Sequence, residues 1–287
     1  MNLRSVRKKI RSIRNVRKIT KAMQMVSAVK MRKAQAVEME SRPYRDGLNA
    51  IINKIAPHVD PEHSQLLSRE NDGERNLIIF ITSNKGLAGA FNVTLFRFLL
   101  RTNVDFKKTD FITVGSKGAQ FVSRMGGNVL ADFSEGSALI EVSAIFEFVL
   151  NKYLNENTYR SVSVVYNRFI STLRSETIIE KLLPFIMRTD ENIAESTTNQ
   201  SEYLIEPSPE AIIDQLLKSY LEDRIRGAII SSEAVEHSMR MMAMKNATDN
   251  AQDVIYTLTL IGNKLRQEKI TNELLDMVTA KESVEVS

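Results

Sequence analysis

The sequence predicts a mixed α+β and α/β fold: a long antiparallel two-helix coiled coil formed by both chain ends, and a small central α/β domain. Two observations carry this prediction. All six prolines lie between residues 43 and 209, so both ends of the 287-residue chain lack the main breaker of helices. Between them, short β-branched runs alternate with helical patterns. We expect the coil to comprise residues 1–57 and 208–287, and the central domain residues 74–207.

The first long helix is expected from about Leu3 to Arg42. Its apolar residues recur in steps of 3, 4, 3, 3, 3, 4, 3 and 3: Leu3, Val6, Ile10, Ile13, Val16, Ile19, Met23, Val26 and Val29. Such steps are typical of one helical face, narrow enough to be the seam of a coiled coil. A strand would need a period of two.

The second long helix is expected from about Pro209 to Thr279, with Ser208 as its N-cap and only Gly227 and Gly262 as weak points. Roughly 70 residues at about 1.5 Å each would extend about 105 Å, which exceeds any compact domain of this size. The helix therefore needs a partner along its length, and the N-terminal helix is the only other candidate in the chain.

The methionines suggest how the two helices pair. Eight of the twelve lie in residues 23–39 or 239–244. Aligning these two windows places residue i near residue 265 − i, with Met23 opposite Met242. In this register the last twenty or so residues have no partner helix.

The central segment has the pattern of a small Rossmann-like domain with a mostly parallel sheet. Strands are expected at Leu77–Thr82, Phe111–Val114 and Val162–Tyr166, and helices at about Asn92–Arg101, Lys117–Met125 and Ser137–Tyr153. Residues 57–75 are expected to be a polar connector, and residues 188–202 an exposed loop.

The composition excludes several classes of protein. Without cysteine there are no disulfides, thiolate metal sites or cysteine nucleophiles. Three histidines cannot supply an HExxH motif or a histidine triad. No run of about 18 apolar residues occurs, so we expect no membrane-spanning helix and a soluble or peripheral, cytosolic protein.

Catalytic and metal-binding candidates are weak. No Ser/His/Asp or paired-carboxylate arrangement stands out, so we expect no active site in this chain. His58, Asp60, Glu62 and His63 could bind a metal, but they lie in a proline-containing connector with no rigid frame. We interpret them as solvated linker residues.

Charge is distributed unevenly along the chain. Residues 1–33 contain twelve Lys or Arg and no acid, whereas the rest carries 27 bases and 35 acids. A basic end of this kind could bind nucleic acid, act as a transit peptide, or lie near an acidic protein surface. No aromatic residue precedes Tyr44, which disfavours base stacking, and the same apolar stripe continues past Met31, which disfavours a cleaved leader.

The segment Ser83–Ala90 (SNKGLAGA) follows a predicted strand and precedes a predicted helix, which is the position of a phosphate-binding loop. A Walker loop requires GxxxxGK[ST], and here Lys85 precedes Gly86. We therefore favour a plain turn or a partner-contact loop over nucleotide binding.

Four segments carry a specific resemblance. They are Ile10–Met31 (IRSIRNVRKITKAMQMVSAVKM), Thr82–Gly89 (TSNKGLAG), Glu233–Asn250 (EAVEHSMRMMAMKNATDN) and Leu258–Leu274 (LTLIGNKLRQEKITNEL). The first is close to the pattern I-x-S-[IV]-x-N-x-x-K-I-T-x-A-M-x-M-V-[AS]-A-x-K. Together, in matching order and spacing, they resemble the gamma subunit family of F-type ATP synthases. The tail Met277–Ser287 departs from the family, since it is more polar than the usual small, apolar end.

The resemblance implies a rotor shaft without an active site of its own. The coil would turn inside the ring of alpha and beta subunits, and the α/β domain would contact the epsilon subunit and the c-subunit ring. Ion-driven rotation would cycle the beta subunits through their nucleotide states, with Mg-ATP and ADP bound by alpha and beta and no cofactor in this chain. The signature begins almost at Met1, which favours a bacterial protein. The resemblance then implies one copy per complex, peripheral on the cytoplasmic face of the inner membrane.

The resemblance also implies contact residues for the beta subunit. Near its acidic lever we expect Lys18, Thr20, Lys21, Met23, Lys30, Lys85 and Gly86. Arg240 would face the Met23 region, and the beta catch loop would engage Arg266, Gln267, Thr271 and Glu273. Two alternatives stay open: a basic coiled coil that binds nucleic acid, and a free-standing nucleotide-binding enzyme.

Overall fold

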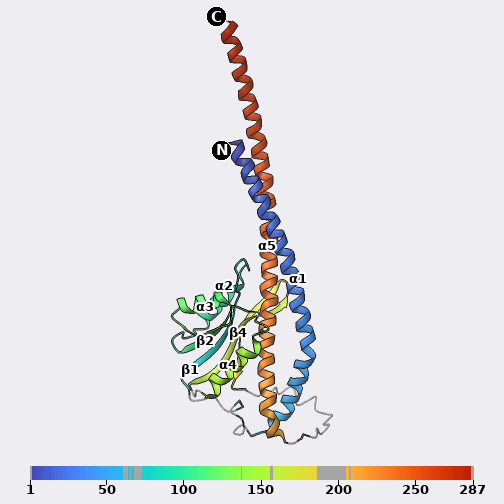
Figure 1. Ribbon diagram of the computed structural model, residues 1–287, viewed down its shortest axis with the longest axis vertical. Helices are drawn as coiled ribbons and strands as arrows, with labels where there is room; N and C mark the ends of the chain where they lie inside the picture. The colour runs from blue at the N-terminus through green and yellow to red at the C-terminus, as the bar shows by residue number, and fades with distance from the viewer. Residues whose placement is uncertain are drawn as a thin grey trace. The chain divides into compact units, whose positions relative to one another are not determined.

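The computed structural model divides the chain into two compact units (Figure 1). Residues 2–60, 64, 66–67, 73–136, 138–155, 158–185, 205–206 and 208–285 are described, without the side chains of residues 58 and 280–285. We call residues 1–28 with 240–287 the coil unit, and residues 29–239 the sheet unit. Both long helices contribute to both units. The unit boundaries therefore differ from those of the predicted domains (residues 1–57 with 208–287, and 74–207), and the predicted domain boundaries stay a prediction. The predicted loop 188–202 lies outside the described residues.

Helix α1 spans Leu3–Ile55 and continues through Pro43, where the sequence suggested an end. Proline removes one backbone donor and leaves the carbonyl of residue i−4, here Met39, without its helical partner. Met39 and Pro43 both lie on the exposed side of α1, so water can satisfy that carbonyl. The helix then passes into a short 3₁₀ turn, Ala56–His58.

Helix α5 spans Pro209–Glu285, slightly longer than the predicted range. Its start is as expected: the Ser208 hydroxyl accepts a hydrogen bond from the amide of Ala211 at 3.3 Å, and proline occupies the first helical position. No helix of the described residues is long and apolar enough to cross a membrane.

The described residues of the sheet unit form a five-stranded sheet in the order β3-β2-β1-β4-β5. Its strands are β1 (Arg75–Ile81), β2 (Thr109–Val114), β3 (Asn128–Asp132), β4 (Tyr159–Ser171) and β5 (Arg174–Leu183). All neighbours pair in parallel except β4 with β5, which form an antiparallel hairpin. The mostly parallel sheet is therefore confirmed, and β3 and β5 are strands that the sequence analysis missed.

Shorter helices connect the strands; in the part of the chain that the structure describes they are α2 (Phe91–Arg101), α3 (Ser116–Arg124) and α4 (Val142–Asn155). Apolar residues gather in two buried clusters, as expected for a sheet covered on both faces. One cluster joins α2 and α3 to the sheet around Phe80, Leu95 and Val122. The other joins α4, α5 and the second half of α1 around Ile145, Leu217 and Ile52.

A buried polar group holds the amino ends of the strands together. Asp110 of β2 accepts hydrogen bonds from Arg75 of β1 (3.0 Å), from Asn128 of β3 (2.9 Å) and from the Tyr159 hydroxyl of β4 (2.9 Å). Burial alone would raise the pKa of Asp110, but these hydrogen bonds and the charge of Arg75 outweigh it and lower the pKa.

Candidate functional site

The seam of the coil unit follows a strict heptad pattern. On α1 the buried and half-buried seam positions are Leu3, Val6, Ile10, Ile13, Arg17, Thr20, Gln24 and Ser27, in alternating steps of three and four. On α5 they are Met244, Thr248, Ala251, Ile255, Leu258, Gly262 and Leu265. A mean period of 3.5 keeps one side of each helix facing the other in a coiled coil.

The α1 side of this seam is polar in its second half. The hydroxyls of Thr20 and Thr248 share a hydrogen bond of 2.8 Å, Arg17 donates to the Gln252 side chain, and Ser27 is buried. The predicted apolar seam is therefore wrong beyond Ile13. Its steps average 3.25 residues, which is too short for a fixed face of a coiled coil, so the stripe rotates out of the seam.

The register also differs from the prediction. Thr20 lies opposite Thr248, and a Cβ atom built on Gly262 would lie 3.5 Å from Val6, so residue i faces about residue 268 − i. The methionine-based register of 265 − i is wrong by about one helical turn. Methionines were a poor guide because Met25 and Met39 are 62% and 76% exposed and do not face α5.

The outer surface of the coil unit is both apolar and basic. Val16, Ile19 and Val26 are 49%, 60% and 56% exposed, and the lysines Lys18 and Lys21 lie among them, also exposed. The unit as a whole carries fifteen bases against seven acids. Large apolar side chains clustered on an exposed helix mark a surface that a partner covers.

Beyond Leu265, helix α5 has no α1 segment opposite it, as expected (Figure 1). All side chains from 266 to 279 are exposed, including the large apolar ones Ile270, Leu274, Leu275, Met277 and Val278. The predicted contact residues Arg266, Gln267, Thr271 and Glu273 all belong to this segment. Among them, Glu273 forms an ion pair with Lys269 at 3.4 Å.

The loop after β1 is rigidly built. Leu87 and Gly89 both have positive φ, at 62° and 58°. The Ser83 amide donates to the Asn92 side chain (3.2 Å), whose own amide group donates back to the Ser83 hydroxyl (2.7 Å). The tip, which contains the predicted contact residues Lys85 and Gly86, is exposed, and Leu87 is 65% exposed.

The amide groups beside this loop already have partners. At the start of α3, Ser116 donates to the Asn84 side chain (2.9 Å), Lys117 to the Ser83 carbonyl (3.2 Å) and Gly118 to the Thr82 hydroxyl (2.8 Å). A phosphate at this helix end would need the same donors. On the other side of β1, the Asn167 side chain donates to the Phe91 carbonyl (3.2 Å) and lies where Rossmann-like folds receive nucleotides. The geometry favours a contact loop over a nucleotide site.

The remaining predicted contact residues differ in exposure. Lys18, Lys21 and Lys30 are exposed, and Met23 is half-buried. Thr20 and Arg240 are 9% and 8% exposed, so their side chains present little surface to a partner. Of the candidate metal residues, Glu62 and His63 lie outside the described residues. Among the side chains that are described, no three His, Asp or Glu lie close enough to share a metal ion.

Comparison with known proteins decides the family. A family profile described as ATP synthase matches residues 2–284. ATP synthase gamma chains of Geobacter sp. (strain M21) and Moorella thermoacetica (strain ATCC 39073 / JCM 9320) are 35% and 33% identical, each over 99% of both chains. The chain belongs to the ATP synthase gamma chain family. The gamma family acts in ATP synthesis as the rotary central stalk of the F-type enzyme, and these matches give no support to the nucleic-acid alternative.

Solved structures agree with the predicted fold. A chain of the Euglena gracilis mitochondrial ATP synthase (OSCP/F1/c-ring, rotational state 3) matches with a TM-score of 0.69 and 18% identity, covering 98% of this chain and 94% of that one. A chain of the Tetrahymena thermophila mitochondrial ATP synthase (central stalk/c-ring) matches with a TM-score of 0.58 and 24% identity, covering 80% and 99%. The gamma-family fold, a terminal coiled coil with a central Rossmann-like domain, is thereby confirmed.

Proposed function

We propose that the coil unit is the part of the shaft that turns inside a ring of alpha and beta subunits, and that it drives the beta subunits through their nucleotide states. The observation that carries this proposal is the placement of polar side chains inside the coil unit and apolar ones outside. Its seam is partly polar, while Val16, Ile19 and Val26 are exposed. A surrounding sleeve of protein would cover these side chains at every angle of rotation.

Weak and replaceable contacts suit a rotating surface. Lys18, Lys21, Lys30 and Lys85 are exposed bases that would approach an acidic surface of the beta subunit. An exposed ion pair is worth at most about 1 kcal/mol, so each contact can break as the shaft turns. Thr20 and Arg240 are buried in the chain and would act on the beta subunit through the shape of the coil.

The unpaired end of α5 would engage a catch in the beta subunit. Arg266, Gln267, Thr271 and Glu273 lie on this single helix, which has no α1 segment beside it to shield them. A long guanidinium and a carboxamide next to each other can form several directional hydrogen bonds to a loop. The more polar tail after Met277 would set how the tip is held.

The remaining partners follow from the same role. The sheet unit would contact the epsilon subunit and the c ring, with one copy of the chain per complex on the cytoplasmic face of the membrane. Mg-ATP and ADP would bind to alpha and beta, and this chain would need no cofactor.

Reconstitution tests the proposal. The chain is mixed with alpha and beta subunits from the same source, the complex is isolated by gel filtration, and Mg-ATP hydrolysis is compared with and without the chain. We expect one copy to co-elute and the activity to depend on it. Elution of the chain alone, with unchanged activity, would contradict the proposal.

A pair of variants then locates the catch. Arg266→Ala and Gln267→Ala should lower the activity of the isolated complex. The matched control is Lys264→Ala, an exposed cation on the same helix whose ion pair with Glu268 spans 4.0 Å, and it should leave the activity unchanged. Equal effects of all three variants would argue against a specific catch.

A further inference from the structure

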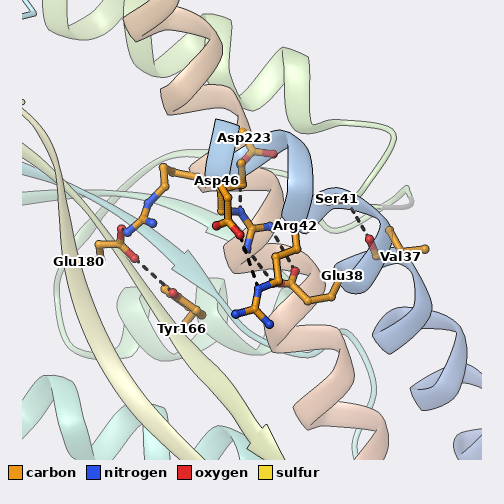
Figure 2. Close-up of polar contacts among 10 residues, drawn as sticks. Val37, Glu38, Ser41, Arg42, Asp46, Tyr166, Glu180 and Asp223 are labelled. Atoms are coloured by element: carbon orange, nitrogen blue, oxygen red, sulfur yellow. Dashed lines mark hydrogen bonds and ion pairs between the residues drawn. The ribbon is translucent and has the colours of Figure 1, made fainter. Parts of the chain in front are cut away.

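A cluster of charged side chains joins four elements of the sheet unit (Figure 2). Its members are Glu38 and Arg45 of α1, Asp223 and Arg224 of α5, Glu180 of β5 and Tyr166 of β4. The sequence analysis singled out none of them, and the proposed contacts with partner subunits do not use them.

Arg45 is held by two carboxylates at once. Its Nε donates to Asp223 across the helix pair at 3.0 Å, and its two terminal nitrogens donate to the Glu38 carboxylate at 2.7 and 3.3 Å. The Arg45 and Asp223 side chains are only 17% and 7% exposed. The hydrogen bonds and charges of Glu38 and Asp223 raise the pKa of Arg45, so it stays charged in this setting.

Gly227 makes room for this arginine. It lies one helical turn after Asp223, and a Cβ atom at Gly227 would stand 2.9 Å from Nη2 and 3.2 Å from Cζ of Arg45. Glycine in a helix interior is unfavourable relative to alanine, so its presence in the middle of α5 needs a reason. Together, Asp223 and Gly227 form a slot on α5 that fits one guanidinium.

The cluster replaces an apolar seam in this part of α1. Among the described residues of α1, none between Ala34 and Leu48 is a buried apolar one. The heptad positions in that interval are Glu38, Ser41 and Arg45, and the Ser41 hydroxyl bonds within its own helix, to the Val37 carbonyl at 2.8 Å (Figure 2). The arginine is therefore the main tie between α1 and α5 over this stretch.

The cluster continues from α5 into the sheet. Arg224, the neighbour of Asp223, forms an ion pair with Glu180 of β5, and the Tyr166 hydroxyl of β4 donates to the same carboxylate at 3.2 Å. Arg224 also lies over the ring of Tyr220, with its guanidinium carbon 5.6 Å from the ring centroid. Two adjacent residues of α5 thus hold it to two different elements, Asp223 to α1 and Arg224 to β5.

We propose that Arg45 is a positioning residue for torque transfer, which locks α1 against α5 and, through the neighbouring Arg224–Glu180 pair, locks both helices to the sheet. The proposal rests on the proposed function, since only a rotating shaft places a load on this contact. A slide of α1 by one turn would remove Arg45 from the slot and leave Asp223 buried without its partner. Apolar seams slide more easily, whereas a buried polar pair specifies one register.

The first test uses the whole ATP synthase in membrane vesicles, with Arg45→Met in this chain. ATP hydrolysis and the membrane potential that hydrolysis generates are measured in the same vesicles. The control is Arg42→Met, one turn earlier on α1, whose ion pair with Asp46 spans 3.7 Å with side chains 77% and 67% exposed. Arg45→Lys, which keeps the charge but not the planar fork, is the conservative variant.

We expect Arg45→Met to hydrolyse ATP at close to the wild-type rate per assembled complex while the potential per ATP falls, because the shaft slips. Arg45→Lys should restore part of the potential, and Arg42→Met should change neither quantity. Equal falls in the rate of ATP hydrolysis and in the membrane potential for Arg45→Met, or no change in either, would overturn the proposal. A wild-type chain that supports no ATP-driven potential would instead defeat the proposed function itself.

A second test needs no assembled complex. Gly227→Ala is introduced into the full chain, alone and together with Arg45→Ala, and thermal unfolding is followed by circular dichroism. With Arg45 present, the added methyl group of Gly227→Ala should lower Tm relative to wild type. In the Arg45→Ala background, the better helix propensity of alanine should raise Tm by about 2 °C relative to Arg45→Ala alone. The same sign in both backgrounds would show that Arg45 does not occupy the slot.

Discussion

The two units of the chain distribute their apolar and polar side chains in opposite ways. The sheet unit buries its large side chains in two apolar clusters, and carries 24 bases against 28 acids. The coil unit puts threonine, serine and arginine into its seam, leaves valine and isoleucine outside, and carries fifteen bases against seven acids. The sheet unit therefore has an apolar core of its own, whereas the coil unit leaves large apolar side chains exposed that a partner would cover.

Truncation of a buried side chain should give the largest difference in stability loss between the two units. Phe80 is fully buried, with its ring centroid 6.1 Å from that of Phe96. Phe80→Ala should lower the free energy of unfolding by about 3–5 kcal/mol, while Val6→Ala, in the seam of the coil unit, should cost only about 2 kcal/mol. Urea unfolding of the chain measures both free-energy losses. The control is Leu100→Ala, which should be near-neutral because the Leu100 side chain is 48% exposed. Equal costs at Phe80 and Val6 would remove the contrast.

The buried carboxylate of the sheet unit gives the next largest effect. Asp110→Asn keeps the shape of the side chain but removes the charge that Arg75 faces, and should cost about 2–3 kcal/mol at neutral pH. Because the folded-state pKa of Asp110 lies below that of the unfolded chain, its contribution is complete above about pH 4 and is lost as the pH falls through the folded value.

Urea unfolding at a series of pH values checks this expectation. The difference in stability between wild type and Asp110→Asn should stay constant from neutral pH down to about pH 4 and shrink below it. Asp46→Asn, which affects only an exposed ion pair on α1, should give a small difference throughout. A wild-type advantage that stays constant with pH would contradict the assignment to ionised Asp110.

The sequence was informative wherever one physical signal dominated. Proline-free ends and helical steps predicted both long helices, and β-branched runs predicted the three central strands, because central parallel strands are apolar on both faces. The missed strands, β3 and β5, are the two edges of the sheet. Edge strands pair on one side only and carry polar residues, so the apolar runs are short: three residues in Asn128–Asp132 and two at a time in Arg174–Leu183.

The seam and the site were harder to predict because they depend on contacts between distant residues. The apolar stripe and the seam coincide from Leu3 to Ile13 and then separate, and only the 3.5-residue period of the whole helix reveals which face is inside. Arg45 carries no local signal at all. The one available clue was Gly227, a glycine without an evident reason in the interior of a long helix.

Glu233, a largely buried acid of the sheet unit, should have a smaller effect on stability. Burial and the charge of Glu236 raise the pKa of Glu233 on α5, against a smaller opposing effect of Lys30 and Lys33. A raised folded-state pKa means that ionisation destabilises the fold as the pH rises above the unfolded value. Glu233→Gln should therefore raise Tm by a few degrees at pH 7 and leave it unchanged below about pH 4. A lower Tm at pH 7 would show that the two lysines dominate instead.

The smallest effect tests the polar seam of the coil unit. Thr20→Val alone removes the Thr20 partner of the Thr248 hydroxyl, which keeps its own hydrogen bond to the Met244 carbonyl (2.8 Å), and should cost at most about 1 kcal/mol. Thr20→Val combined with Thr248→Val replaces both hydroxyls by methyl groups of the same shape, and should be neutral or slightly stabilising. Thermal unfolding of the single and double variants measures this coupling.

If the double variant is instead much less stable than the wild type, the hydroxyl pair holds the coil together, and the coil unit depends less on its surroundings than its exposed surface indicates. If it is as stable as expected, the seam is polar for a reason other than stability. The hydroxyl pair would then serve to specify the register of the coil unit, as Arg45 does in the sheet unit, rather than to add stability.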